Sequence, residues 1–161
     1  MIFGYKCFNK GLTNRYGYKF EVGKEYIRTG EIKFGNNGNG FHFCKNIEDT
    51  FRYFNAMEEE IEVCLVIGDG ACEKYEDTYN EYYDLYSVEK LKIVKVLTRE
   101  EIINIGINLD EIRVKRFIQG FKLNSQEIEL FKDKFQNNIS VINVILYYQD
   151  KDKEVYKRLL K

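Results

Sequence analysis

The sequence lacks a long hydrophobic run and a secretory leader. Its longest apolar stretch, IEVCLVIG at 61–68, has the length of a strand and falls well short of the ~20 residues that span a bilayer. The first residues, MIFGYKCFNKG, show no cationic region followed by an apolar core and a cleavage site. We therefore expect no membrane segment, no signal peptide and a cytoplasmic protein.

Proline and tryptophan are absent, there is one histidine, and none of the four cysteines forms a C-x-x-C pair. Without a secretory signal, the cysteines are expected to stay reduced. His42 and Cys44 share one face of a predicted strand and could ligate one metal ion, completed by Cys7, Cys64 or Cys72. The spacings match no standard zinc module, so we expect no metal site and a structural role for His42.

A nucleophilic cysteine and a phosphate-binding loop are the other local chemistries. Cys44 and His42, two apart on a strand, lie about 7 Å from each other, too far for thiol activation, although Cys7 or Cys64 could replace Cys44. The glycine-rich GNNGNG at 35–40 precedes a strand, whereas a phosphate cradle needs a following helix. We interpret it as a hairpin turn.

What the sequence does contain is 44% hydrophobic residues, typical of a folded globule, and a segregated charge. The net charge is +5 over residues 1–47, −10 over 48–86 and +4 over 87–161. The acidic middle could attract a basic partner or imitate a phosphate backbone, or it could fold against its own basic flanks.

The N-terminal half shows strand patterns interrupted by glycine. We predict strands at 5–9, 18–28, 31–34, 40–44, 61–70 and 90–98, with 31–34 and 40–44 forming a hairpin. Residues 46–57 have helical spacing after a capping Asn46, and the strand at 61–70 is expected to end at its glycines.

From Thr98 onward the pattern is helical. Thr98 with Glu101 and Asn124 with Glu127 form predicted capping boxes, and Asp152 could cap a last helix. The basic stretch 112–122 carries two phenylalanines, but we expect a solvated helix face rather than direct nucleic-acid binding. The expected class is α+β, with a mostly antiparallel sheet domain at 1–97 and a helical subdomain at 98–161 packed on it.

The stretch EKYEDTYNEYYDLY at 73–86 places tyrosines at helical spacing with acids between them. Tyrosine supplies rigid contact area, and carboxylates can occupy phosphate-binding sites of a basic partner. The alternative is that the tyrosines pack on the protein's own sheet. The candidate binding residues are Tyr75, Glu76, Asp77, Tyr79, Glu81, Tyr82, Tyr83, Asp84 and Tyr86.

The motifs YKCFNKGLT, FEVGKEY, GFHFCKN and KLKIVKVLT occur in this order, with an apolar strand before the last. This pattern resembles a family of uncharacterised domains found largely in phage and prophage proteins, over residues 4–100. The resemblance implies no assigned activity, and the helical remainder lies outside it.

A second resemblance is to the ADP-ribosyltransferase fold, which holds NAD between two antiparallel sheets. It implies Lys6 as the first-strand cation, His42 or Cys44 in the second element and Glu89 as the late glutamate that stabilises an oxocarbenium-like ribose. Lys6 stands in place of Arg or His, and Cys44 in place of Ser.

Two functions follow as expectations. The favoured one is a non-enzymatic binding or inhibitory module of a mobile element, without a cofactor, acting on a host macromolecule. Its sharpest version is counter-defence against a nuclease system, with a basic or nucleic-acid-binding protein as the partner. The alternative is an NAD-dependent ADP-ribosyltransferase or its inactive relative. We favour the first because the sequence lacks a convincing catalytic set.

Overall fold

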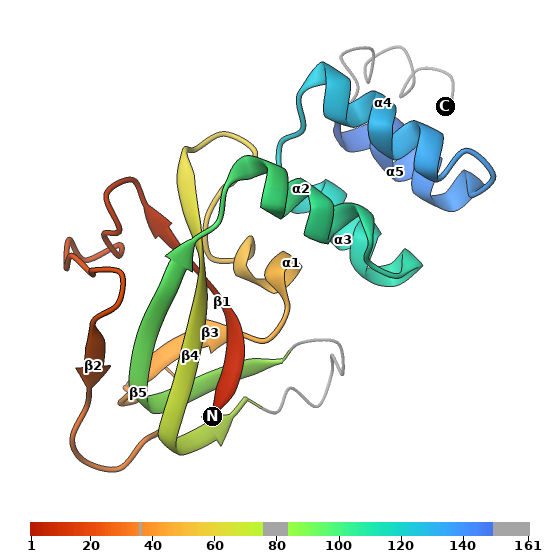
Figure 1. Cartoon of the computed structure of the whole chain (residues 1–161). Coiled ribbons are helices and arrows are strands. Elements are labelled where there is room, and N and C mark those ends of the chain that lie inside the picture. Colours follow the sequence, from red (N-terminus) through yellow and green to blue (C-terminus); the bar gives the residue numbers. More distant parts are fainter. Residues whose placement is uncertain (36, 76–83, 150–161) are drawn as a thin grey trace.

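The computed structural model describes residues 1–35, 37–75 and 84–149, and over them the chain has the expected α+β class. Strands come first and helices dominate the second half (Figure 1). The strands are β1 (Ile2–Asn9), β2 (Glu25–Ile27), β3 (Phe41–Cys44), β4 (Ile61–Lys74) and β5 (Leu85–Val96). The helices are α1 (Ile47–Thr50), α2 (Arg99–Ile107), α3 (Glu111–Gly120), α4 (Ser125–Lys134) and α5 (Ile139–Tyr148).

The antiparallel sheet closes on itself. Its order is β2-β5-β3-β1-β4, and a further pairing joins β4 to β5, so that β5, β3, β1 and β4 form a ring with β2 attached to β5. Closure leaves few strand edges open to another chain. The ring encloses a first core made of Phe8, Phe20, Tyr26, Phe41, Phe43, Cys64, Val66, Val88, Leu91 and Ile93.

Strand β4 does not end at its glycines, as the sequence predicts, but continues to Lys74. Gly68 makes room for Phe43 of β3, because a Cβ at this position would lie 2.5 Å from the phenyl Cε1. Gly70 has a φ of 76° and lies within a register shift between β4 and β5, which is typical of a bulge. The glycines thus accommodate packing and a bulge inside a strand rather than stopping it.

Two predicted N-terminal strands are wrong in extent. The strand at 18–28 shrinks to β2, because Gly23 adopts a φ of 83°, outside the strand region. The expected hairpin reduces to a single bridge between Lys33 and Asn39, and no strand forms at 31–34. Strand β3 pairs instead with β5 and β1, because the ring supplies partners that the local turn does not.

Two predicted helices are also corrected. Helix α1 covers only one turn, although the following Phe51 and Phe54 still pack in the core. The ends of the predicted helix at 73–86 are strand: Lys74 of β4 pairs with Tyr86 of β5. The β4–β5 ladder therefore replaces the expected helix at both ends of this stretch, whereas residues 76–83, which include Tyr79, Tyr82 and Tyr83, lie outside the described residues.

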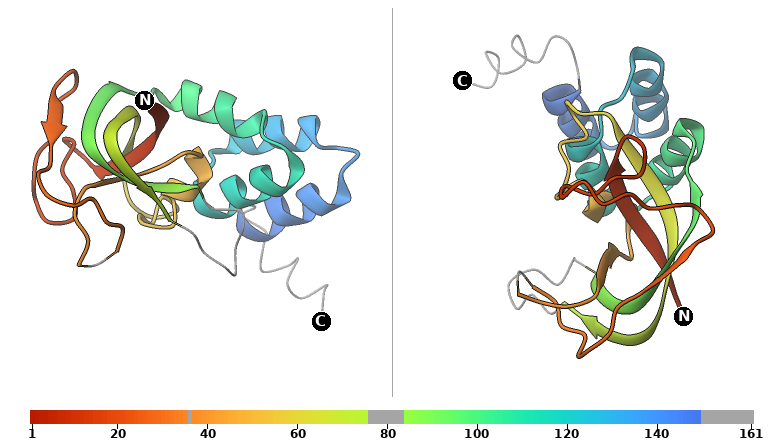
Figure 2. Two further views of the ribbon diagram at one scale, coloured as in Figure 1. Left: turned by 90° about the horizontal axis from the view of Figure 1, so that it is seen from below. Right: turned by 90° about the vertical axis from the view of Figure 1, so that its left-hand side faces the viewer.

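The C-terminal helices begin where the sequence predicts. Both capping boxes, Thr98 with Glu101 and Asn124 with Glu127, are confirmed, whereas Asp152 lies outside the described residues. Figure 2 shows helices α2 to α5 grouped at one end of the sheet, with α1 between the sheet and these helices. None of the described helices has the length and apolarity needed to traverse a bilayer.

A second core joins the sheet to the helices. Cys7 of β1 and Val63 of β4 belong to the same buried cluster as residues of α1, α2, α3, α4 and α5. Its other buried members are Ile47, Phe51, Ala56, Ile102, Ile103, Val114, Phe117, Ile118, Phe121, Leu123, Ile128, Phe131, Val141 and Ile145. The division at residue 97 stays a prediction.

Buried ion pairs fix α1 to α3. Glu48 and Asp49 are 3% and 0% exposed. Arg113 donates to both oxygens of Glu48, at 2.6 and 3.2 Å, and Arg116 pairs with Asp49. The expected solvated face of 112–122 is therefore wrong for these two arginines, and part of the acidic middle does fold against the basic C-terminal flank.

The Asp49 carboxyl predicts a pH dependence of stability. Burial raises its pKa from 3.8 to about 6, although Arg116 opposes this shift. Between pH 4 and 6 the Asp49 carboxyl is therefore protonated in the folded state and ionised in the unfolded state. The free energy of unfolding then falls as the pH rises through this window. The difference corresponds to about 3 kcal/mol.

The measurement is urea unfolding of the wild type and Asp49→Asn at pH 4, 5, 6 and 7. We expect the stability of the wild type relative to the variant to drop by about 2 to 3 kcal/mol between pH 4 and 7. A constant difference across the range would show that Asp49 has an ordinary pKa.

Gly68 provides a packing test. Gly68→Ala should reduce the free energy of unfolding by about 1–3 kcal/mol, because its methyl group would meet Phe43 and Val88. In the Phe43→Leu background the same change should have a smaller effect, with a coupling of about 1 kcal/mol in urea unfolding. Additive effects would place Phe43 away from Gly68.

Candidate functional site

A pocket of about 670 Å³ opens against strands β1 and β3. This volume lies within the usual range for small-molecule sites. Besides the two strands, its walls come from segments 14–20, 34–40 and 50–54, with Arg28 after β2. The polar and charged lining side chains are Lys6, Asn14, Arg15, Arg28, His42 and Thr50, and the aromatic ones are Tyr5, Tyr16, Tyr18, Phe20, Phe34, Phe41, Phe43, Tyr53 and Phe54.

Lys6 reaches the pocket from β1. Its Nζ donates to the carbonyl oxygen of His42 at 2.5 Å and lies 5.7 Å from the Phe8 ring. Burial lowers the pKa of Lys6, and the charge of Arg15 lowers it further, while the thiols of Cys44, Cys7 and Cys64 oppose the shift. No carboxylate pairs with this amine among the described residues.

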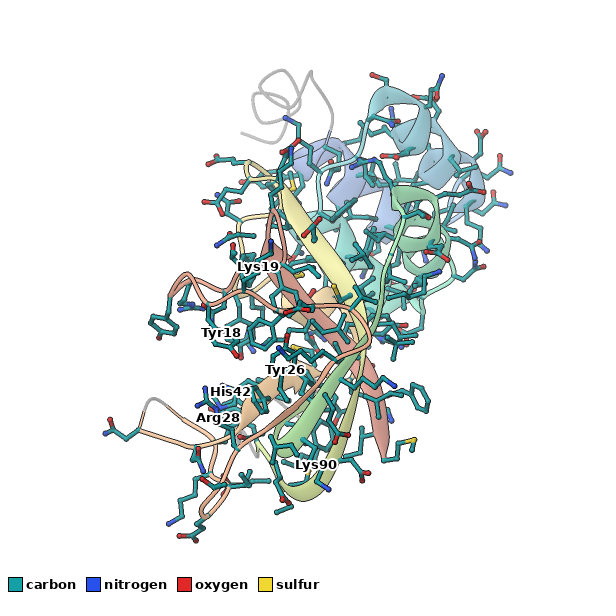
Figure 3. All side chains as sticks on the ribbon, turned by 60° about the vertical axis from the view of Figure 1, so that its left-hand side comes forward. Tyr18, Lys19, Tyr26, Arg28, His42 and Lys90 are labelled. Carbon is teal, nitrogen blue, oxygen red and sulfur yellow. The ribbon has the colours of Figure 1, made fainter. Side chains whose placement is uncertain are left out.

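His42 presents its ring to Phe34. The two rings are stacked, with centroids 4.5 Å apart and planes 18° from parallel, and Tyr75 contacts Phe34 at 4.9 Å. Burial and the nearby Lys6 both lower the pKa of His42, so its imidazole is neutral at pH 7. Figure 3 shows His42, Arg28 and Tyr18 on the same side of the sheet, along the pocket.

The two arginines of the pocket differ from those of the helices. Arg28 lies over the Phe41 ring at 5.1 Å, and neither Arg28 nor Arg15 has a carboxylate partner among the described residues. By contrast, Arg99 and Arg113 each pair with a glutamate. The described lining of the pocket contains no aspartate or glutamate, so its fixed charges are all positive.

The structure brings together two of the three residues that the ADP-ribosyltransferase resemblance implies. Lys6 and His42 share the pocket, with Cys44 beside them. Glu89 does not line it: its carboxylate accepts the backbone N–H of Ala71 at 2.9 Å, at the β4 bulge. This glutamate binds the backbone at the bulge and lies outside the lining that holds Lys6 and His42.

The described part of the acidic tyrosine block contacts its own domain. Tyr75 packs on Phe34, and Tyr86 stacks on Phe43 at 5.5 Å. Asp84 forms an ion pair with Lys74 at 2.5 Å. The remaining candidates, Glu76, Asp77, Tyr79, Glu81, Tyr82 and Tyr83, lie outside the described residues.

Sequence reasoning missed Arg15, Arg28, Phe34 and Tyr53 as pocket residues. A signal was present, since residues 1–47 carry a net charge of +5 interleaved with tyrosine and phenylalanine. Basic residues interleaved with aromatic ones are typical of surfaces that bind nucleic acid, in which cations contact phosphates and rings stack on bases. It did not reveal which of these side chains the fold gathers around one cavity.

The model of a family described as a domain of unknown function, DUF7666, matches residues 2–105. The chain belongs to this family. The match confirms the expected resemblance to a family of uncharacterised domains, whereas phage association and ADP-ribosyltransferase likeness receive no support from it. Searches of curated proteins and of solved structures found no significant match. All residues that line the pocket lie within the DUF7666 region.

The DUF7666 region also holds the four cysteines, all of them free. Cys7, Cys44 and Cys64 are buried, and Cys72 is exposed. Burial raises the pKa of Cys7 and that of Cys64 to about 12, and it raises the pKa of Cys44 as well. Within the described ranges no three His, Cys, Asp or Glu side chains gather as metal ligands.

Thiol titration tests this arrangement. At pH 8 the folded protein should react with one equivalent of 5,5′-dithiobis(2-nitrobenzoate), at Cys72, and with four equivalents in guanidinium, because burial protects the other thiols and disfavours their thiolates. Cys72→Ser should leave the folded protein unreactive. Rapid reaction of Cys44 in the folded variant would instead indicate an activated nucleophile.

Proposed function

We propose that this DUF7666 domain is a non-enzymatic binding module that captures an anionic ligand in the pocket that opens against β1 and β3. One observation carries the proposal: the pocket gathers Lys6, Arg15 and Arg28 without a carboxylate partner among the described residues, and no acid lines it. By contrast, Arg99, Arg113 and Arg116 each pair with an acid. Unpaired cations in a concave site favour a ligand of the opposite charge.

Desolvation strengthens this preference. Lys6 is held against a backbone carbonyl rather than a counter-ion, and Arg28 rests on the Phe41 ring, so neither is neutralised by the protein. An entering anion would supply the missing charge beside the partly buried Lys6, where Coulomb attraction is stronger than in water, and would also meet the exposed Arg15 and Arg28. The binding free energy would then come largely from pairing cations that have no counter-ion in the free protein.

A binding role agrees better with the pocket than NAD cleavage does. The oxocarbenium-stabilising glutamate implied by the ADP-ribosyltransferase resemblance is Glu89, whose carboxylate is engaged with Ala71 outside the pocket. The described lining offers His42 and Lys6 but no carboxylate. The residues therefore support recognition of a ligand rather than its hydrolysis.

The partner expected from the sequence, a basic protein such as a nuclease that docks on the acidic tyrosine block, stays a prediction. Tyr75, Asp84 and Tyr86 already have partners within the domain. Most of the block lies outside the described residues. The counter-defence role and the mobile-element origin stay with that prediction, and the pocket carries the present proposal.

Pyrophosphate is the probe for anion capture. We expect it to bind in calorimetric titration at low salt, and Arg15→Gln or Arg28→Gln to weaken binding about tenfold or more, since each variant loses a charge-assisted contact. Lys90→Gln is the matched control, because Lys90 lies on β5 of the same sheet but outside the pocket lining (Figure 3).

Proton linkage gives a second readout. The pKa values of Lys6 and His42 are both lowered in the free pocket, and a bound anion favours their charged forms. At pH values where either group is partly deprotonated in the free pocket, binding should therefore take up protons and tighten as the pH falls, and buffers of different ionisation enthalpy measure this uptake. Lys6→Met should reduce it. Absence of binding, or equal weakening by Lys90→Gln, would overturn the proposed function.

A further inference from the structure

Resting on the proposed function, we infer that the captured anion is a nucleotide, with its phosphate near Lys6, Arg15 and Arg28 and its base against the tyrosines of the pocket wall. Charge alone would suit any polyanion. The lining adds a second feature, which is a set of exposed aromatic rings around the cations.

The exposed rings are Tyr16, Tyr18 and Tyr53, at 86%, 54% and 44%. Single exposed aromatic side chains are ordinary on a protein surface, whereas several of them around one cavity are not. The clustering of these three rings therefore points to a ligand. Tyr18 is held from behind by Phe20, with ring centroids 4.9 Å apart, and by Tyr26 at 6.2 Å. Its position is therefore fixed by the sheet core while half of its surface remains available.

The pocket also has a rigid ring wall. Phe34 stacks on His42 and also contacts Tyr75, whose ring is tilted by 35°, and Arg28 lies on Phe41. Flat rings fixed by such contacts lose little conformational freedom on binding. Stacking of a base on one aromatic ring contributes about 1–3 kcal/mol and tolerates any base. Rings and cations in one cavity therefore match the two halves of a nucleotide.

The distribution of the two features decides between ligand classes. An inorganic polyphosphate would use the cations and leave the tyrosines idle. A neutral aromatic compound would use the rings and leave Arg15 and Arg28 unpaired. The pocket volume of about 670 Å³ accommodates one nucleotide unit rather than a folded partner. A ligand with a planar base and a phosphate satisfies both sets of residues.

The experiment compares ligands that differ by one part. Calorimetric titration of the full chain uses the four ribonucleoside 5′-monophosphates, ribose 5-phosphate as the matched ligand without a base, and pyrophosphate. We expect at least one nucleoside monophosphate to bind tenfold or more tighter than ribose 5-phosphate. In Tyr18→Leu and Tyr53→Leu this ratio should fall below threefold, while Phe3→Leu, an exposed ring outside the lining, should leave it unchanged.

Thermal unfolding of each variant verifies that it folds. If all four nucleoside monophosphates bind no tighter than ribose 5-phosphate while pyrophosphate still binds, the nucleotide inference is wrong and anion capture survives. If neither pyrophosphate nor any nucleotide binds, both proposals fail. A ratio that Tyr18→Leu and Tyr53→Leu leave at its wild-type value would also overturn the inference, because the base would then lie elsewhere.

One further arm identifies the source of the nucleotide. A 5′-phosphorylated trideoxynucleotide carries the same base and phosphate at the end of a strand. Binding of this trimer tenfold tighter than the monophosphate would indicate the end of a single strand, and equal or weaker binding would indicate a free nucleotide. Either result supports the nucleotide chemistry once the base-dependent ratio is present.

Discussion

Glu48 and Asp49 lie on a helix of four residues, between the sheet and the helical part, and both carboxylates are removed from water. Arg113 and Arg116 of α3 compensate them from across the second core. Loss of one partner from such a buried pair leaves an uncompensated charge, at a cost of about 3–5 kcal/mol. Thr50 of the same helix and Tyr53, three residues further on, line the pocket, so the ion pairs anchor the segment from which this part of the wall comes.

Glu48 and Asp49 are buried, so their negative charges do not lie at the pocket. A chain of net charge −1 can therefore have a pocket whose charged lining residues are all cations. In the acidic middle segment, the carboxylates of Glu48 and Asp49 pair with arginines of α3, and that of Glu62 accepts the backbone N–H of Leu12 at 2.8 Å. Basic residues of the first 47 positions are left without acids beside them at the cavity. Average charge is therefore a poor guide to the potential of a site.

Local patterns predicted what local interactions decide. The α+β class, the strands around Cys64 and Ile93 and both capping boxes follow from side-chain period and from hydrogen bonds three residues apart. The failures depend on distant partners. Lys6 and His42 are separated by 36 positions and Glu48 and Arg113 by 65, and no sequence period encodes such contacts. The ends of the stretch 73–86 show the same limit, because Lys74 and Tyr86 pair in a ladder between two strands where the local spacing predicts a helix.

The end of the family match falls at residue 105, inside α2. Helix α2 buries Ile102 and Ile103 against Val114 and Phe117, which lie beyond the match. The matched region taken by itself thus ends in an apolar flank that requires a cover. In this chain α3, α4 and α5 supply the cover, and α3 also brings the two arginines that pair with Glu48 and Asp49. The matched region by itself would therefore expose an apolar surface and leave two buried carboxylates without their cations.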